Sequence, residues 1–209
     1  MTSIEPQEFW LLLPEIVLAI FGMALLVAGT RGRGFGGRLA AMVSLTGLGV
    51  TTILVVWTQG QATLGAPILA GMFIIDGFAL YWKVLFLVAT ALTIFLSTRF
   101  IEDGGYRPGE YYSLLLLATT GMMLMVSGFN LLSIWISLEL MALSSYILAG
   151  YFKHETRSNE AALKYFILGA LSSGIMLYGM SLLYGATGSL DLAEIAQTLP
   201  AAAQSMGLL

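Results

Sequence analysis

Four ionisable side chains lie inside long apolar runs of the sequence: Glu15, Lys83, Glu139 and Lys164. An ionised group at the centre of a bilayer costs at least ~2.5–3.5 kcal/mol, so residues of this kind usually face polar partners and mark ion or proton pathways. Desolvation favours the neutral form of a carboxyl group, whereas a nearby cation favours the charged form. A carboxylate balanced between these two effects can bind and release protons near neutral pH, so proton transfer is the chemistry to consider first.

The elements that position these residues are predicted to be membrane-spanning helices. The chain has 209 residues, of which 58% are hydrophobic and 10% charged, whereas soluble domains carry roughly 25% charged residues. Runs of about 20 apolar residues are typical of spanning helices. We expect one all-α, multi-pass membrane domain over residues 1–209, with about six spans at residues 9–30, 39–58, 77–98, 111–127, 131–152 and 161–185. The sequence Gly128-Phe129-Asn130 should separate the fourth span from the fifth, and residues 189–209 should form a short amphipathic tail.

Composition excludes several other classes of function. The chain has no cysteine, which excludes disulfides, thiolate metal sites and cysteine nucleophiles. The net charge of -3 and the absence of a large basic patch argue against binding of nucleic acid. The first apolar run follows the acidic leader MTSIEPQE, so we do not expect a cleavable signal peptide. His154, the only histidine, lies in a charged loop, where solvation is more common than metal binding, and we predict no metal site.

Positive charges between the apolar runs predict the orientation of the chain. Lysines and arginines occur only in alternate connections, those after the first, third and fifth runs: Arg31, Arg33 and Arg38, then Arg99 and Arg107, then Lys153 and Arg157. Loops rich in Lys and Arg stay in the cytoplasm. The N-terminus and the segment after the sixth helix should therefore lie on the outer side.

Glu139 is the deepest of the charged residues. It lies about eight residues from the outer end of its predicted helix, or roughly 12 Å, close to the midplane of a ~30 Å hydrocarbon core. Proton handling is the favoured interpretation, although a structural hydrogen bond or a cation ligand would also explain a buried carboxylate. Lys164 lies about one turn from the cytoplasmic end of the sixth helix, and on position alone it could equally be a lysine that extends to the interface. The two residues differ in depth by more than a side chain can span, so we expect no direct salt bridge between them.

The other two charges receive structural interpretations. Lys83 is expected to extend toward the outer headgroups, as long lysine side chains do. Glu15 follows Pro14, and proline and acids both suit a first helical turn. Glu15 is therefore expected at a helix end and not in the interior. Small residues that cluster on the sixth helix indicate a packing face.

The two final helices carry a family resemblance. The runs FNLLSIWISLELMALSSYILAGYF and KHETRSNEAALKYFILGALSSGIMLYGMSLLYGATGSLDL closely resemble subunit N of proton-pumping NADH-quinone oxidoreductase (complex I), which has counterparts in the mitochondrial and plastid-type enzymes. The runs LLLPEIVLAIFGMALL and DGFALYWKVLFLVATALTIFLS also look like that subunit. The motif RSNEAALKYF separates this subunit from the related antiporter-like subunits L and M.

The resemblance implies a fold and a role for two residues. The fold would be the first part of an antiporter-like inverted-repeat fold, in which charged residues near mid-membrane form a proton path. The glutamate of the family's helix five matches Glu139 and the lysine of its helix six matches Lys164, so both would belong to a proton relay. In the family the glutamate pairs with a lysine on a later, broken helix that this sequence does not contain, which suggests a fragment or a split subunit.

The implied function is proton translocation coupled to electron transfer from NADH to quinone, as a subunit of the translocase without redox catalysis in this chain. No cofactor is expected here, whereas the complex as a whole would use NADH, flavin, iron–sulfur clusters and quinone. The expected partners are membrane subunits of the M, K, J and L types and the lipid bilayer, in a bacterial inner membrane. Two alternatives remain: a subunit of a multisubunit cation/proton antiporter, and a structural or assembly piece of membrane protein without transport activity.

Overall fold

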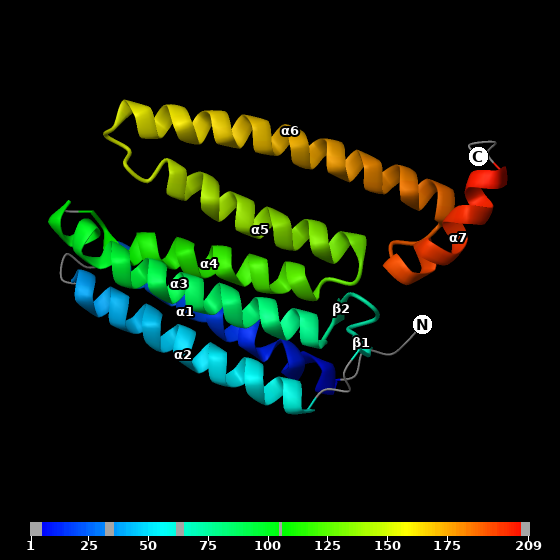
Figure 1. Ribbon diagram of the computed structural model, residues 1–209. Helices are drawn as coiled ribbons and strands as arrows, with labels where there is room; N and C mark the ends of the chain where they lie inside the picture. Colours follow the sequence, from blue (N-terminus) through cyan, green and yellow to red (C-terminus); the bar gives the residue numbers. More distant parts are fainter. Residues whose placement is uncertain (1–5, 32–35, 62–64, 105, 206–209) are drawn as a thin grey trace.

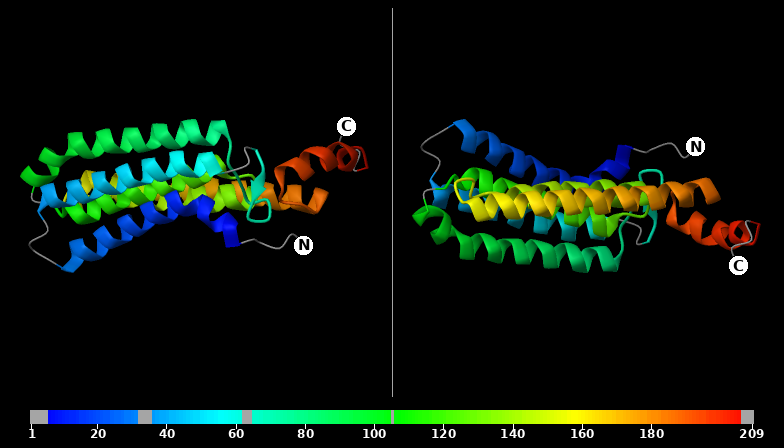
Figure 2. Two further views of the ribbon diagram at one scale, coloured as in Figure 1. Left: turned by 90° about the horizontal axis from the view of Figure 1, so that it is seen from below. Right: turned by 90° about the horizontal axis from the view of Figure 1, so that it is seen from above.

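The protein is an elongated bundle of helices that lie side by side (Figure 1, Figure 2). The computed structural model describes residues 6–31, 36–61, 65–104 and 106–205. Within these ranges six helices are long and apolar enough to cross a membrane, which confirms the predicted all-α membrane fold. They are α1 (Leu13–Arg31), α2 (Gly37–Gln61), α3 (Gly77–Asp103), α4 (Pro108–Ser127), α5 (Leu131–Ala149) and α6 (Thr156–Thr187).

Short elements gather at one end of the bundle. They are the 3-10 helix η1 (Pro6–Leu12), the antiparallel strands β1 (Pro67–Ile68) and β2 (Phe73–Ile74), and α7 (Leu192–Ser205). Figure 1 shows both strands and α7 at the same end of the bundle. Glu8 Oε2 accepts a hydrogen bond of 2.8 Å from the backbone N–H of Leu69, and the Ser133 hydroxyl donates to the carbonyl of Met72 at 2.7 Å. These bonds tie the hairpin to η1 on one side and to α5 on the other.

Capping residues explain where several helices begin and end. The Asp76 side chain accepts from the N–H of Ala79 at the start of α3, and Asn130 forms a capping box with Ser133 at the start of α5. The predicted break at residues 128–130 is confirmed, since α4 ends at Ser127 and α5 begins at Leu131. Capping by side chains satisfies amide groups that have no partner within the helix.

Some predicted boundaries were wrong by about a turn. The fifth helix was expected to reach residue 152, but it ends at Ala149 with Gly150 as its C-cap. The sixth was expected from 161 to 185, but α6 runs from Thr156 to Thr187 because its polar first turns are helical as well. A helix of 32 residues is roughly 48 Å long, so α6 extends beyond a ~30 Å hydrocarbon core. The predicted tail is the helix α7, and residues 206–209 and Arg33 lie outside the described residues.

The core of the molecule surrounds α4. In the most apolar stretch of α4, 56% of the residues are buried, compared with 11% in α6. Helix α4 packs on α1, α3 and α5, whereas α6 packs on α5 and α7. Two glycines allow α4 to approach its neighbours closely. A Cβ at Gly109 would lie 2.9 Å from the Cα of Gly29 in α1, and one at Gly121 would lie 2.6 Å from the backbone nitrogen of Met141 in α5. Helix α6 therefore forms the edge of the bundle.

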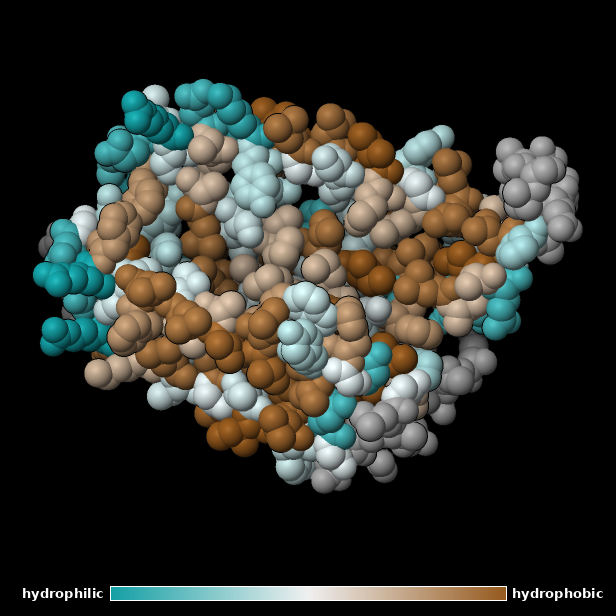
Figure 3. All heavy atoms as spheres, viewed as in Figure 1, coloured by the Kyte–Doolittle hydropathy of each residue, from teal (hydrophilic) through white to brown (hydrophobic). Residues whose placement is uncertain are grey.

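The outer surface of the bundle matches a membrane environment. Large apolar side chains are exposed along most of the helices, and Figure 3 shows hydrophobic residues over the middle of the visible face and hydrophilic residues at the end where α5 connects to α6. Exposed apolar patches of this extent are typical of membrane contacts or contacts with other helices.

Candidate functional site

Glu139 lies on the face of α5 that is turned toward α6. The hydroxyl of Ser173 donates a hydrogen bond to Glu139 Oε1, and the indole Nε1 of Trp135 donates to Ser173 Oγ at 3.1 Å. Trp135 and Glu139 are four residues apart and so lie on the same face of the helix. Ser173 is the only buried residue among those of α6 whose burial the structure describes. The three side chains form one hydrogen-bonded network between α5 and α6.

The network leaves the carboxylate with capacity for further partners. Glu139 is half-buried, and among the described residues the Ser173 hydroxyl is its only hydrogen-bond donor. None of the ion pairs within the described ranges includes Glu139. A carboxylate can accept several hydrogen bonds. The carboxylate is not fully enclosed and can therefore accept further hydrogen bonds from water or a cationic group.

Lys164 occupies a different environment on α6. Its ammonium group forms an ion pair with Glu160 one turn earlier, and 69% of its side chain is exposed. Lys164 and Ser173 are separated by nine residues of α6, or roughly 14 Å along the helix axis. In the described residues the ion-pair partner of Lys164 is Glu160. The assignment of Lys164 to a proton relay stays a prediction.

The interpretation of Lys83 and Glu15 as interfacial residues was wrong. Lys83 Nζ lies 2.7 Å from Glu15 Oε1, and the exposed fractions of the two side chains are only 6% and 2%. Glu15 lies in the first turn of α1, as expected, but its side chain is buried, because it pairs with Lys83 of α3 inside the bundle. The Lys83 side chain points inward to α1 and not toward the headgroups. The only signal in the sequence was the presence of two opposite charges near the same ends of two apolar runs.

The two charged sites lie at a similar depth. Gly109 of α4 packs against Gly29 of α1, and Gly121 of α4 packs against the backbone of α5. Counting residues along the antiparallel helices from these contacts places Glu15 and Glu139 within about one turn of the same level. Helix α4 lies between α1 and α5 (Figure 1). The bundle therefore has a closed ion pair on one side of α4 and an open carboxylate on the other.

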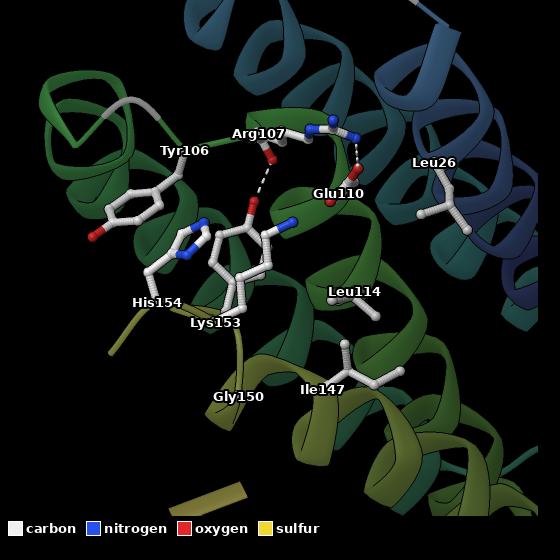
Figure 4. A pocket seen from close by; sticks show the side chains of 10 residues that line it. Leu26, Tyr106, Arg107, Glu110, Leu114, Ile147, Gly150, Lys153 and His154 are labelled. Atoms are coloured by element: carbon white, nitrogen blue, oxygen red, sulfur yellow. Dashed lines mark hydrogen bonds and ion pairs between the residues drawn. The ribbon is translucent and has the colours of Figure 1, made fainter. Parts of the chain in front are cut away.

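The opposite end of the bundle carries a polar cavity (Figure 4). The phenol of Tyr151 donates a hydrogen bond to the backbone carbonyl of Arg107, which links the α5–α6 connection to the start of α4. Burial, followed by the negative charge of Glu110, raises the pKa of Tyr151 to about 12. Tyr151 therefore remains a neutral hydrogen-bond donor at physiological pH. His154 lines the same cavity, and the described residues contain no cluster of three or more potential metal ligands.

Comparison with known proteins identifies the family. A family model described as "NADH:quinone oxidoreductase/Mrp antiporter, TM" matches residues 128–209. NADH-quinone oxidoreductase subunit N 2 of Rhizobium meliloti is 44% identical over 186 residues, which are 89% of this chain and 38% of that protein. Subunit N of Parvibaculum lavamentivorans is 41% identical over 202 residues, 97% of this chain and 41% of that protein. The chain is a homologue of NADH-quinone oxidoreductase subunit N. It spans about two fifths of the length of the subunit N proteins that it matches.

Solved structures show the same fold in two kinds of respiratory assembly. Respiratory complex I from Thermus thermophilus with bound aureothin contains a chain that is 34% identical, with a TM-score of 0.67 over 86% of this chain and 38% of that one. The membrane-bound sulfane sulfur reductase, an archaeal respiratory membrane complex, contains a chain that is 26% identical, with a TM-score of 0.70 over 91% of this chain and 40% of that one. The antiporter-like fold of subunit N is thus confirmed for this chain.

Sequence reasoning missed two members of the site. Ser173 was assigned to a stripe of small packing residues, and Trp135 was not singled out. The spacing of Trp135 and Glu139 on one helix face was visible in the sequence, but the depth at which α6 packs on α5 was not. Contact between Ser173 and both side chains follows from that packing.

The Glu15–Lys83 pair should behave as one unit when it is mutated. Replacing only Lys83 with methionine leaves a buried, uncompensated carboxylate and should cost about 3–5 kcal/mol of unfolding free energy. The double variant Glu15→Leu/Lys83→Met should recover most of this loss, because no buried charge remains. Unfolding of the purified protein in mixed micelles measures both effects. Lys164→Met is the matched control, since an exposed ion pair contributes about 0–1 kcal/mol. If the double variant lost as much unfolding free energy as Glu15→Leu and Lys83→Met lose together, the two residues would not be coupled.

Proposed function

We propose that this chain forms part of the proton path in the membrane domain of a proton-pumping NADH-quinone oxidoreductase, with Glu139 as its protonatable group. The observation that carries the proposal is the network in which Ser173 bridges Trp135 and Glu139. It places a carboxylate about 12 Å into a membrane-spanning helix with one oxygen held by a hydroxyl and no counter-charge among the described residues. The similarity to subunit N proteins supports this function.

The hydroxyl of Ser173 can serve both protonation states of Glu139. It donates to the carboxylate when Glu139 is ionised, and it can rotate to accept a hydrogen bond from the carboxylic acid when Glu139 is neutral, because a hydroxyl has one donor and two acceptor positions. Trp135 can only donate, so its indole keeps Ser173 in place without competing for the carboxylate. This arrangement holds the position of the carboxyl group while the proton enters and leaves on its open side.

Lys164 would act at the end of α6 that is proposed to be cytoplasmic. The roughly 14 Å between Lys164 and Ser173 along the helix requires water or further side chains between the two groups. Glu160 holds the ammonium group of Lys164 by an ion pair, and protonation of that carboxylate would release it. Lys164 would thereby exchange protons with the cytoplasmic surface, while its direct electrostatic effect on Glu139 is weakened by distance.

Electron transfer would take place in other parts of the complex. The chain has no cysteine to bind an iron–sulfur cluster, and no cofactor is proposed here. NADH, flavin, iron–sulfur clusters and quinone would belong to other subunits. The proposed partners are membrane subunits of the M, K, J and L types, of which one, or a further segment of a longer subunit N, would supply the counter-charge of Glu139.

A transport function without NADH is the second candidate. The matched family model names Mrp antiporters together with NADH:quinone oxidoreductases, and the sulfane sulfur reductase complex contains the same fold. The fold alone is therefore not specific for one redox partner. Identities of 41–44% to subunit N proteins favour the NADH-dependent enzyme. Copurification with a flavin-containing peripheral arm would distinguish it from a cation/proton antiporter.

Substitution of the central carboxylate tests the proposed function. In membranes that contain the complete complex, Glu139→Gln should reduce NADH-driven proton pumping by about 100-fold, the lower end of what a positioned proton-transfer group contributes. Glu139→Asp should retain part of the activity because the titratable group is kept. Asp103→Asn, which removes an exposed carboxylate at the end of α3, is the control and should affect pumping far less. An assembled complex that pumps normally with Glu139→Gln would show that Glu139 is not in the path.

We also propose that the N-terminus and α7 face the periplasm. The chain has no native cysteine, so single cysteines can be introduced at exposed positions beyond each end of α6. Glu155→Cys lies before α6 and Gln197→Cys lies after it. A membrane-impermeant maleimide applied to intact spheroplasts should label the cysteine at position 197 and not the one at 155. Labelling of both positions, or of 155 alone, would contradict this topology.

A further inference from the structure

The cavity at the Arg107 end of the bundle is a groove with an apolar wall. It has a volume of about 570 Å³. Leu114 of α4 is buried beneath it, and Leu26 of α1 and Ile147 of α5, which are 37% and 56% exposed, form its sides. Figure 4 shows these three side chains on one side of the cavity and the polar residues on the other. The groove is therefore open between α1 and α5, with α4 as its floor.

The polar side of the groove carries more positive than negative groups. Arg107, Lys153 and His154 line it together with one acid, Glu110. Arg107 Nη1 lies 2.9 Å from Glu110 Oε1, so this acid neutralises one cation and orients its guanidinium group. Lys153 and His154 are exposed, and Lys153 forms none of the ion pairs among the described residues. The remaining donors of the Arg107 guanidinium and the Lys153 ammonium group are free to bind an anion.

The groove lies at the depth where the bilayer changes from apolar to polar. Helix α4 begins at Pro108 and α5 ends at Ala149, so the cationic side of the groove is at the helix ends and the apolar side is inside the spanning region. Tyr106 and Tyr151 also line the groove, and tyrosine is enriched at the boundary between membrane and water. A ligand that fills the groove must be anionic at one end and apolar at the other.

We infer that this groove binds an anionic phospholipid. The phosphate would lie between Arg107 and Lys153, and the upper part of one acyl chain would lie against Leu26 and Ile147. Basic pockets between spanning helices on the cytoplasmic side recognise lipid headgroups in this way. The lipid would join α1 to the connection between α5 and α6 and thereby brace the end of the bundle that carries Lys164. This inference is independent of the role of Glu139.

Photo-crosslinking tests the lipid site directly. The full-length protein, with p-benzoylphenylalanine in place of Ile147, is reconstituted in liposomes that contain equal amounts of phosphatidylglycerol and phosphatidylcholine. After irradiation, mass spectrometry should detect mainly the phosphatidylglycerol adduct. Lys153→Gln should lower the ratio of the two adducts about fivefold, the effect expected from one basic side chain near a membrane surface, and Lys153→Arg should restore it.

Two matched controls separate the groove from general surface charge. Arg157→Gln removes a positive charge from the same end of the helix bundle, but Arg157 does not line the groove. This variant should leave the adduct ratio unchanged. The photoreactive residue in place of Ile136, which is exposed on the same helix outside the groove, should show no preference for phosphatidylglycerol. An excess of soluble glycerophosphoglycerol should not compete, because it lacks the acyl chain.

Three results would overturn the inference. Equal adducts of the two lipids at position 147 would show that the groove does not select an anionic headgroup. An equal effect of Arg157→Gln and Lys153→Gln would show that surface charge alone determines the ratio. Crosslinks to polypeptide instead of lipid would show that protein covers the groove.

Discussion

Hydrogen bonds attach helix α6 to α5 at two levels: Ser158 donates to the Ala149 carbonyl at 2.7 Å near one end, and Ser173 contacts Glu139 and Trp135 deeper in the bundle. Between two helices in a bilayer the hydrophobic effect provides little attraction, so van der Waals packing and interhelical hydrogen bonds determine how the helices associate. Ser173, the one residue of α6 that is described as buried, donates to Glu139 and accepts from Trp135. The position of α6, and with it the position of Lys164, depends on this contact together with the Ser158–Ala149 hydrogen bond. The same contact keeps the carboxylate at a fixed depth.

Charge compensation differs between the two acidic sites of the bundle. Glu15 is buried and paired with Lys83 at 2.7 Å, so its charge is balanced within the chain, and removal of either partner would leave an isolated charge at a high cost. Glu139 is half-buried and has only a neutral hydroxyl as its partner among the described residues. Since the two sites lie at nearly the same depth, depth alone does not decide whether a carboxylate is structural or free to exchange protons. We propose that the presence or absence of a nearby counter-charge makes this difference.

The sequence predicted the number and type of the helices because membrane spans depend on local composition alone. It also predicted the break at Gly128–Asn130, where turn-forming residues interrupt the apolar run, and the family, whose motifs lie in α5 and α6. It placed Glu15 correctly in a first helical turn but failed for its burial, because no pattern showed that Lys83 of α3 would pair with it inside the bundle. It also failed for Lys83 and Ser173, because their partners depend on which helices pack together and at what register. That register is determined by close contacts such as the one at Gly121, which a single sequence does not reveal.

We propose that Glu139 exchanges a proton while its carboxyl group is held by Ser173. Infrared difference spectroscopy of the protein in membranes, with pH as the variable, tests this proposal most directly. A carbonyl stretch of a protonated carboxylic acid should appear when the pH is lowered, should be absent in Glu139→Gln, and should shift in frequency in Ser173→Ala because the hydrogen bond is lost. A spectrum in which Glu139→Gln removes no titrating carboxyl band would contradict the account.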